Sequence, residues 1–252
     1  MDPRPIGVMD SGLGGISVLR TLVKELPDES FFYLGDTQNA PYGDRPEAEI
    51  LELTRNCVGK LVDMGVKAVC IACNTATSAA EEALRAALPI PVVGIEPALK
   101  PAALAGRPGK ILVMATAATI RQEKFQRLNA RYGENALLLP CPGLMEFVER
   151  LELDTPALNA HLDKLLAPFR GEPITSIVLG CTHYPFLNSA ITRRFPHAVL
   201  YEGGMITTLK LKEKLTERDA LGPGPGSVKF FTTGSEGTAA MEQLFALPDS
   251  DF

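Results

Sequence analysis

The sequence predicts an α/β fold: two similar α/β domains with mainly parallel sheets. Short apolar runs recur along its 252 residues, and helical patterns separate them. This alternation favours parallel sheets. Two of the runs, residues 68–73 and 176–181, end in a cysteine followed by small polar residues. Because ligands collect at the carboxyl ends of parallel strands, the two thiols suggest one site assembled from distant halves of the chain.

The first part of the chain predicts four strands, each apolar enough to be buried on both faces of a sheet. The strands are expected at residues 6–10, 31–36, 68–73 and 91–97. Helices are expected between them at residues 16–26, 46–64 and 74–88. Gly65 is the expected C-terminal cap of the second helix, and Asn74 or Thr75 the N-terminal cap of the third.

Prolines and glycines between residues 101 and 110 predict a crossing into a second domain, where the alternation restarts. Its strands are expected at residues 111–115, 136–139, 174–180 and 198–201. Its helices are expected at residues 116–131, 143–151, 156–169 and 185–195. The helix at 205–215, the strand at 227–232 and the helix at 236–244 are expected to return to the first domain. The predicted domains are therefore residues 1–97 plus about 206–252, and residues 98–205.

Composition narrows the class of protein. Hydrophobic residues make up 46% and charged residues 22% of the chain, as in ordinary globular enzymes. The net charge of −5 argues against a nucleic-acid surface, which needs clustered positive charge. No apolar run approaches the ~20 residues of a membrane span, and the first residues do not resemble a secretory signal. Five cysteines, an odd number, fit reduced thiols and a cytoplasmic location.

The segment after the first strand is rich in glycine. Asp10 ends that strand, and Ser11-Gly12-Leu13-Gly14-Gly15 leads into a helix. Glycines and a helix start can bring backbone amides close to an anion. A dinucleotide fingerprint would need a further glycine at Ser17. A carboxylate held by the Ser11 hydroxyl and the turn amides fits equally well.

Metal and dithiol redox chemistry fit the cysteines poorly. Cys70 and Cys73 form a C-x-x-C pair, but the chain has no second pair and only three histidines, whereas zinc needs three or four spaced ligands. A thioredoxin-type pair opens a helix together, and here only Cys73 does. Cys70 lies within the predicted strand and is expected to be a small buried core residue. We therefore expect no metal site.

Cys73 and Cys181 are the candidate chemical groups. A cysteine at a helix start faces backbone N–H groups, which favour its thiolate form. Two cysteines in similar settings suggest a symmetric task, in which one group accepts a proton and the other donates one. Inversion at a carbon atom is such a task. Asp10 and His183 could each assist one thiol. The residues that could bind carboxylates or an ammonium group are Ser11, Asn74, Thr75 and Thr182.

These motifs together resemble the glutamate racemase family, whose members interconvert L- and D-glutamate without a cofactor. The resemblance covers nearly the whole chain. It rests on residues 7–15 (GVMDSGLGG), 33–36 (YLGD), 41–43 (PYG), 72–75 (ACNT) and 179–185 (LGCTHYP), in that order and spacing. The family implies two α/β domains that face each other across an active-site cleft. It also implies D-glutamate supply for peptidoglycan, no cofactor, no membrane or nucleic-acid partner, and a homodimer.

The resemblance also implies roles for individual residues. Cys73 would act on the D-isomer, assisted by Asp10, and Cys181 on the L-isomer, assisted by His183 and a glutamate. Spacing favours Glu149 as that glutamate, but Glu146 shares its helix face. The implied substrate-binding residues are Asp10, Ser11, Pro41, Tyr42, Gly43, Asn74, Thr75, Thr182 and His183. Residues 39–44 are expected to form a rigid turn that presents Tyr42.

Three other functions remain open from the sequence. One is a related racemase acting on aspartate or a hydantoin. Another is a decarboxylase, which needs only one of the two cysteines. The third is a non-catalytic amino-acid-binding protein with a cleft between two domains. A pyridoxal phosphate enzyme is not expected, because no lysine lies among the strand-end residues.

Overall fold

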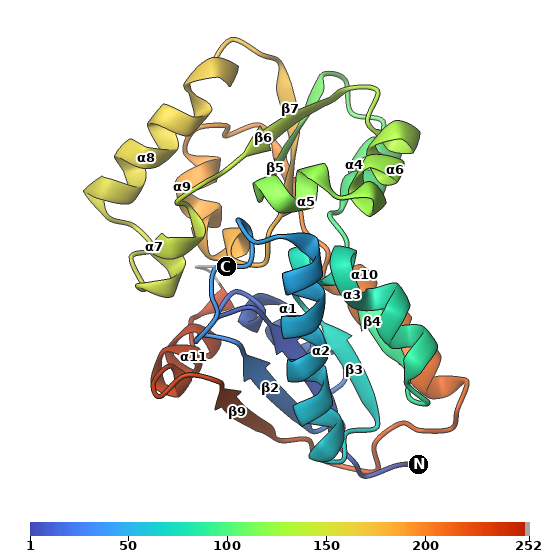
Figure 1. The fold of residues 1–252 in the computed structure, drawn as a ribbon. Helices are drawn as coiled ribbons and strands as arrows, with labels where there is room; N and C mark the ends of the chain where they lie inside the picture. Colours follow the sequence, from blue (N-terminus) through green and yellow to red (C-terminus); the bar gives the residue numbers. More distant parts are fainter. Residues whose placement is uncertain (250–252) are drawn as a thin grey trace.

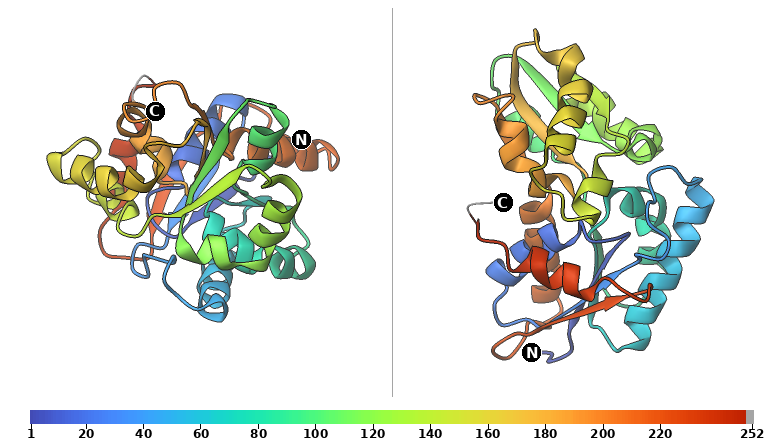
Figure 2. Two further views of the ribbon diagram at one scale, coloured as in Figure 1. Left: turned by 90° about the horizontal axis from the view of Figure 1, so that it is seen from above. Right: turned by 90° about the vertical axis from the view of Figure 1, so that its left-hand side faces the viewer.

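The computed structural model describes residues 1–249. It contains two separate parallel sheets, each with helices on both faces (Figures 1 and 2). We call the first sheet and its helices the first lobe (β1–β4, β9, α1–α3, α10 and α11), and the second sheet and its helices the second lobe (β5–β8 and α4–α9). The predicted fold class is confirmed.

The first sheet has five parallel strands. Its order is β4 (Val92–Gly94), β3 (Ala68–Ile71), β1 (Ile6–Asp10), β2 (Phe31–Gly35) and β9 (Val228–Thr232). Helices α1 (Ile16–Glu25), α10 (Gly204–Thr216) and α11 (Thr238–Phe245) pack together, as do α2 (Glu47–Asp63) and α3 (Asn74–Ala87). Val8 and Met9 of β1 are both fully buried, in different core clusters. This is the double-sided burial that the continuous apolar runs predict.

The second sheet has four parallel strands. Its order is β6 (Ala136–Pro140), β5 (Lys110–Ala115), β7 (Ile174–Gly180) and β8 (Val199–Tyr201). Around it lie α4 (Leu99–Leu104), α5 (Ala117–Arg121), α6 (Glu123–Tyr132), α7 (Met145–Glu149), α8 (Pro156–Leu166) and α9 (Asn188–Thr192). Short 3-10 turns, η1 (Ala167–Phe169) and η2 (Tyr184–Leu187), follow α8 and precede α9.

Both sheets have the same topology around their central strands. In each, the first strand lies between the second and the third, so the strand order reverses between the first and third strands. Open α/β sheets bind ligands at such a reversal, outside the carboxyl ends of the strands. Asp10 and Cys73 lie at or just past this point in the first sheet, and Thr116 and Cys181 in the second. The topology therefore explains why both cysteines reach one region.

Local structure differs from the sequence prediction in three places. Helix α4 occupies part of the expected crossing at residues 101–110, because Pro101 stands in its first turn, where proline is tolerated. The chain instead crosses between β4 and α4. Cys73, and not Asn74 or Thr75, caps α3. The helix expected at 116–131 is split into α5 and α6 by the extended backbone of Gln122.

The boundaries of the two domains stay a prediction, although the strands and helices of each lobe come from the segments predicted for one domain. Within residues 1–249 no helix is both long and apolar enough to cross a membrane.

Candidate active site

Cys73 is held at the start of α3 as a buried thiol. Its Sγ accepts a hydrogen bond from the backbone N–H of Ala76 at 3.4 Å and donates one to Ser11 Oγ at 3.4 Å. Burial, with a smaller contribution from the charge of Asp10, raises the pKa of Cys73 to about 12. The expectation that the helix start favours the thiolate is therefore wrong for this closed arrangement, because desolvation outweighs the backbone N–H. Cys73 is present as a thiol.

Cys181 heads a chain of three side chains. Its Sγ lies 3.5 Å from Nδ1 of His183, and Nε2 of His183 lies 2.7 Å from Oε1 of Glu149. The same Oε1 accepts the backbone N–H of Leu13, in the first lobe, at 2.7 Å. Glu146 is not part of this series of side chains, and its buried Oε2 has no hydrogen-bond partner among residues 1–249. The geometry therefore brings Glu149, and not Glu146, to His183.

The charges of His183 and Glu149 stabilise each other. Burial by itself lowers the pKa of His183, but the neighbouring Cys181 sulfur and Glu149 carboxylate outweigh it and hold that pKa well above 6.5. Burial raises the pKa of Glu149, but the hydrogen bond and charge of His183 outweigh it, so the net pKa lies below 4.5. His183 is thus an imidazolium beside a carboxylate. The positive charge of His183 therefore lies directly beside the Cys181 sulfur.

Asp10 lies fully buried between the two halves of the site. Its Oδ1 accepts the backbone N–H of Gly12 at 2.9 Å, and its Oδ2 accepts the hydroxyl of Thr182, in the second lobe, at 3.2 Å. Burial raises the pKa of Asp10 above 3.8. Asp10 makes no direct bond to Cys73 but influences that thiol through its charge. It therefore lies where a proton exchanged with Cys73 could be shared.

The glycine-rich segment at residues 11–15 is where the second lobe docks. A Cβ at Gly12 would lie 2.2 Å from Oε1 of Glu149, and one at Gly14 would lie 2.3 Å from Nδ1 of His183. These glycines thus allow close approach of side chains from the other lobe. A carboxylate does bind a turn amide, as the sequence suggested, but it is the protein's own Glu149 at Leu13.

Tyr42 lies in the turn that was expected to present it. Its side chain is buried, and its hydroxyl donates a 2.6 Å hydrogen bond to Oδ2 of Asp36. Asn39 also donates to Asp36, so this carboxylate holds the turn in place. The neighbouring Gly43 approaches Thr116 of the second lobe, where a Cβ would lie 3.2 Å from the threonine Cβ. Pro41, in a cis peptide bond, belongs to the same turn.

The sequence predicts a substrate-binding role for Thr75, but it did not predict that the Thr75 hydroxyl forms a cluster with the hydroxyls of Thr116 and Thr119. Thr75 Oγ1 lies 3.0 Å from that of Thr116 and 3.1 Å from that of Thr119, and these two are 3.0 Å apart. The available signal was positional: Thr116 directly follows the first strand of the second sheet, as Ser11 follows Asp10 in the first. Asn74, beside Thr75, has a buried Oδ1 without a partner among the described residues.

Known proteins resemble this chain in sequence and in fold. A model described as Asp/Glu/Hydantoin racemase matches residues 6–206. The chain belongs to this family. A glutamate racemase from Clostridium novyi (strain NT) is 47% identical over 235 residues, 91% of each chain. The crystal structure of glutamate racemase isoform RacE1 from Bacillus anthracis matches with a TM-score of 0.85 at 34% identity, covering 97% of this chain and 93% of that one.

A second solved structure is that of Escherichia coli glutamate racemase in complex with L-glutamate and the activator UDP-MurNAc-ala. It matches with a TM-score of 0.85 at 28% identity and covers 96% of this chain and 94% of that one. The resemblance to glutamate racemases seen in the motifs is confirmed, and so is the expectation of an amino-acid racemase.

In this member of the Asp/Glu/hydantoin racemase family the two lobes enclose the site. Cys73 and Cys181 are 6% and 7% exposed, and Asp10 and His183 are at most 1% exposed. Polar contacts between the lobes, such as Thr182 with Asp10, close over the thiols. Substrate exchange therefore requires the lobes to move apart. Among residues 1–249 no three or more His, Cys, Asp or Glu side chains are grouped as a metal site.

Proposed function

We propose that this protein is a glutamate racemase that moves protons at Cα with two cysteines, without a metal, nucleotide or pyridoxal cofactor. The observation that carries the proposal is the pairing of two strand-end thiols with different partners in one enclosed site. One thiolate removes the Cα proton from one face of the substrate, leaving its electron pair on carbon. The other thiol gives its proton to the opposite face.

The resemblance to glutamate racemases implies that Cys181 acts on the L-isomer and Cys73 on the D-isomer, and the partners of the thiols suit these roles. Cys181, next to the His183 imidazolium, removes the Cα proton of the L-isomer. Cys73, held in the thiol form, supplies a proton to the other face and yields the D-isomer. Glu149 keeps His183 oriented and charged. In the reverse direction Cys73 must first lose its proton, and Asp10 is the nearby buried carboxyl able to share it.

Substrate binding is assigned to polar groups at the strand ends. The Ser11, Thr75 and Thr182 hydroxyls can donate to carboxylates, and the unpaired Asn74 Oδ1 can accept from an ammonium group. Pro41, Tyr42 and Gly43 are implied substrate-binding residues by the resemblance, and the approach of Gly43 to Thr116 across the lobes is compatible with that role. The 47% identical relative is named for glutamate, and the E. coli structure contains L-glutamate. These support glutamate over aspartate or a hydantoin.

The biological role we propose is supply of D-glutamate for peptidoglycan, in the cytoplasm and as a homodimer. The five cysteines are all free thiols, which suits a reducing compartment. Sedimentation equilibrium of the purified protein tests the dimer: a mass near the monomer's 27.1 kDa across micromolar concentrations would contradict it.

The test of the reaction uses each glutamate enantiomer separately in deuterated water. We expect loss of optical rotation together with deuterium at Cα, because the donated proton comes from a thiol that exchanges with solvent. Carbon dioxide release would indicate a decarboxylase, and binding without exchange an amino-acid-binding protein. Aspartate and a hydantoin serve as competing substrates, and faster turnover of either would overturn the assignment to glutamate.

The two-base assignment is tested by Cys73→Ser and Cys181→Ser. Serine preserves the shape but is a far weaker acid than a thiol, so each variant should lose at least about 10²-fold in racemisation rate. Cys70→Ser, in the buried core of the first lobe, is the matched control and should racemise normally if it folds. Normal turnover by either active-site variant would refute the two-base mechanism.

A further inference from the structure

We infer that Lys124 is a positioning residue that holds the two lobes closed over the thiols. Lys124 lies in α6 of the second lobe. Its ammonium group donates to Glu81 of α3 in the first lobe and lies 3.0 Å from Oε1 of Glu96, which follows β4. It is thus one cation shared by two carboxylates across the boundary between the lobes. The inference rests on the proposed function only for its effect on kinetics.

Glu81 is a fixed anchor for this contact. Its side chain is only 5% exposed. Oε1 accepts the backbone N–H of Gly94 in β4 at 2.8 Å and an ion pair from Arg85 on its own helix, which leaves Oε2 to Lys124. Glu81 therefore connects Lys124 to β4, the edge strand of the first sheet, and a displacement of Lys124 would change the contacts of that strand. Lys124 itself is 18% exposed, so water screens the pair only partly.

Glu96 belongs to the segment on which the lobes must turn. The chain passes from the first lobe to the second between β4 and α4, and it returns between β8 and α10. The two passages touch, because a Cβ at Gly203 would lie 2.6 Å from the backbone oxygen of Glu96. Two adjacent crossings with no other chain connection make a hinge. Lys124 therefore links the hinge to the first lobe's α3.

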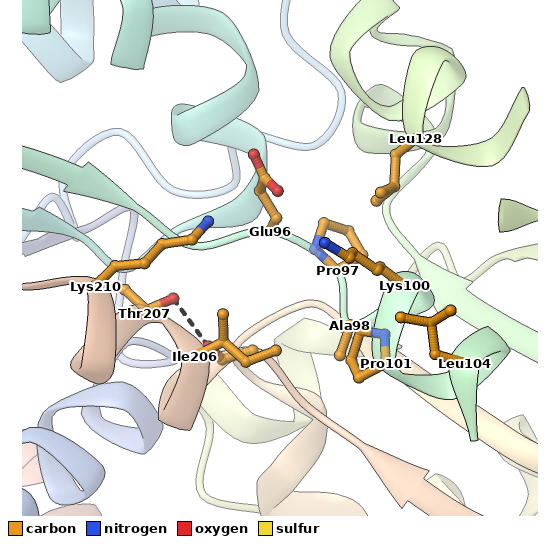
Figure 3. Close-up of a pocket in the computed structure, with 11 residues that line it drawn as sticks. Glu96, Pro97, Ala98, Lys100, Pro101, Leu104, Leu128, Ile206, Thr207 and Lys210 are labelled. Carbon is orange, nitrogen blue, oxygen red and sulfur yellow. Dashed lines mark hydrogen bonds between the residues drawn. The ribbon is translucent and has the colours of Figure 1, made fainter. Parts of the chain in front are cut away.

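The crossing segment also borders free space. Glu96, Pro97 and Ala98 line a cavity of about 290 Å³ together with Thr207 and Lys210 of α10 (Figure 3). Side chains that border a cavity lack packing partners on that side. Packing on the side of the cavity therefore does not hold the segment in place. Lys124 supplies that restraint.

A second ion pair between α6 and α3 lies at the surface and adds little to the contact made by Lys124. Arg127, one turn after Lys124 in α6, lies 3.5 Å from Oε1 of Glu82, next to Glu81. Both side chains are more than half exposed, so this pair contributes little. Removal of Lys124, in contrast, leaves the carboxylates of Glu81 and Glu96 without their common cation. We expect the closed arrangement to lose most of its hinge-side restraint in Lys124→Met.

The thiols themselves report opening. Because Cys73 and Cys181 are enclosed when the lobes are closed, alkylation by N-ethylmaleimide requires the lobes to part. Cys70, fully buried in the core of the first lobe, reacts only when that lobe unfolds. The experiment incubates the ligand-free protein with the reagent at one fixed pH and quantifies labelling of each cysteine by peptide mass spectrometry. Lys124 makes no contact with either thiol, so its replacement leaves their local partners intact.

In Lys124→Met we expect N-ethylmaleimide to alkylate Cys73 and Cys181 roughly tenfold faster than in the native protein, as loss of a charged hydrogen bond implies. The rate of labelling at Cys70 should not change. Lys124→Arg should restore the native rates, and Glu96→Gln should give a smaller increase. The control Arg55→Met removes an exposed pair with Glu52 within α2 and should change nothing. With glutamate as substrate, KM should rise severalfold while kcat changes less, because closure is part of binding.

Unchanged alkylation of Cys73 and Cys181 in Lys124→Met would overturn the inference, whatever the substrate proves to be. Faster labelling of all three cysteines would also count against it, because it would show loss of the fold and not opening. If alkylation accelerates as expected but glutamate is not racemised, the restraint stands and the proposed function fails.

Discussion

Two cysteines that look alike in the sequence have different surroundings. Cys73 contacts a hydroxyl and a backbone N–H, and burial raises its pKa to about 12. Cys181 contacts His183, which is charged and oriented by Glu149. The two-base mechanism that we propose needs one group that accepts a proton and one that donates it. The two cysteines already differ in their partners before substrate binds.

Replacement of Glu149 tests this asymmetry. Glu149→Gln removes the charge that raises the pKa of His183, so less imidazolium is available beside Cys181. We expect kcat from L-glutamate to fall by about 10²-fold, and the high-pH limb of the rate profile to move to lower pH. Glu146→Gln is the matched control on the same helix, and it should retain activity. A pH profile identical to that of the native protein would contradict the role given to Glu149.

The same pair makes stability depend on pH. The contribution of His183, whose folded pKa is raised, is complete below about pH 6.5 and is lost as pH rises through that folded pKa. The contribution of Glu149, whose folded pKa is lowered, is complete above about pH 4.5 and is lost as pH falls. The difference in Tm between native protein and Glu149→Gln should therefore be largest from about pH 4.5 to 6.5. Scanning calorimetry across pH 4 to 9 checks this, and a flat difference would disprove it.

At the scale of elements, the turn between β1 and α1 determines how closely the lobes meet. Gly12 and Gly14 leave space that side chains of the second lobe fill. Tyr33 of β2 donates a 2.8 Å hydrogen bond to the backbone oxygen of Gly12 and fixes the turn from below. The glycines thus serve contact between lobes and not a phosphate group.

Gly14→Ala should abolish this fit. The new Cβ would lie within 2.3 to 2.7 Å of three atoms of the His183 ring, so the ring must leave its place between Cys181 and Glu149. We expect at least about a 10²-fold loss of racemisation, with circular dichroism unchanged. Gly59→Ala is the matched control: no atom lies within 4 Å of its Cβ, it lies inside α2, and alanine there should stabilise by about 1 kcal/mol. Retained activity in Gly14→Ala would show that the ring has room to move.

At the scale of the whole molecule, the site exists only where the two lobes meet. Each sheet brings its reversal of strand order to the boundary, and the contacts across it join residues such as Ser17 and Thr182, 165 positions apart. The closed arrangement excludes water from the reacting groups, which strengthens the electrostatic interactions there. It also means that opening must precede each turnover.

Substrate should therefore protect the thiols. D-glutamate at saturating concentration is expected to slow alkylation of Cys73 and Cys181 at least fivefold, because a closed, occupied site opens less often. Labelling of Cys57, buried in the first lobe outside the site, should not change. L-aspartate at the same concentration is the comparison ligand, and equal protection by both would argue against selectivity for glutamate.

Much of the site was predictable from the sequence because strand ends are local features. Apolar runs that stop at Asp10, Cys73 and Cys181 place these residues at the carboxyl ends of parallel strands, and parallel sheets gather such ends at one edge. The cap at Cys73 was missed because cysteine is rarely a capping residue. Helix α4 was not predictable from the prolines at residues 101–110, because proline usually ends a helix, although it is tolerated in the first turn, where Pro101 lies.

The sequence by itself thus determined the α/β class, most of the order of the elements and the position of two thiols at strand ends, since these follow from periodicity and from short motifs. Only the tertiary structure decided between Glu149 and Glu146. Tertiary contacts also bury Tyr42 against Asp36 and bring the three threonine hydroxyls together. They likewise join Lys124 to Glu81 and Glu96. Those choices depend on contacts between residues far apart in the chain. Desolvation depends on them too, and it raised the pKa of Cys73 where the local helix start alone would lower it.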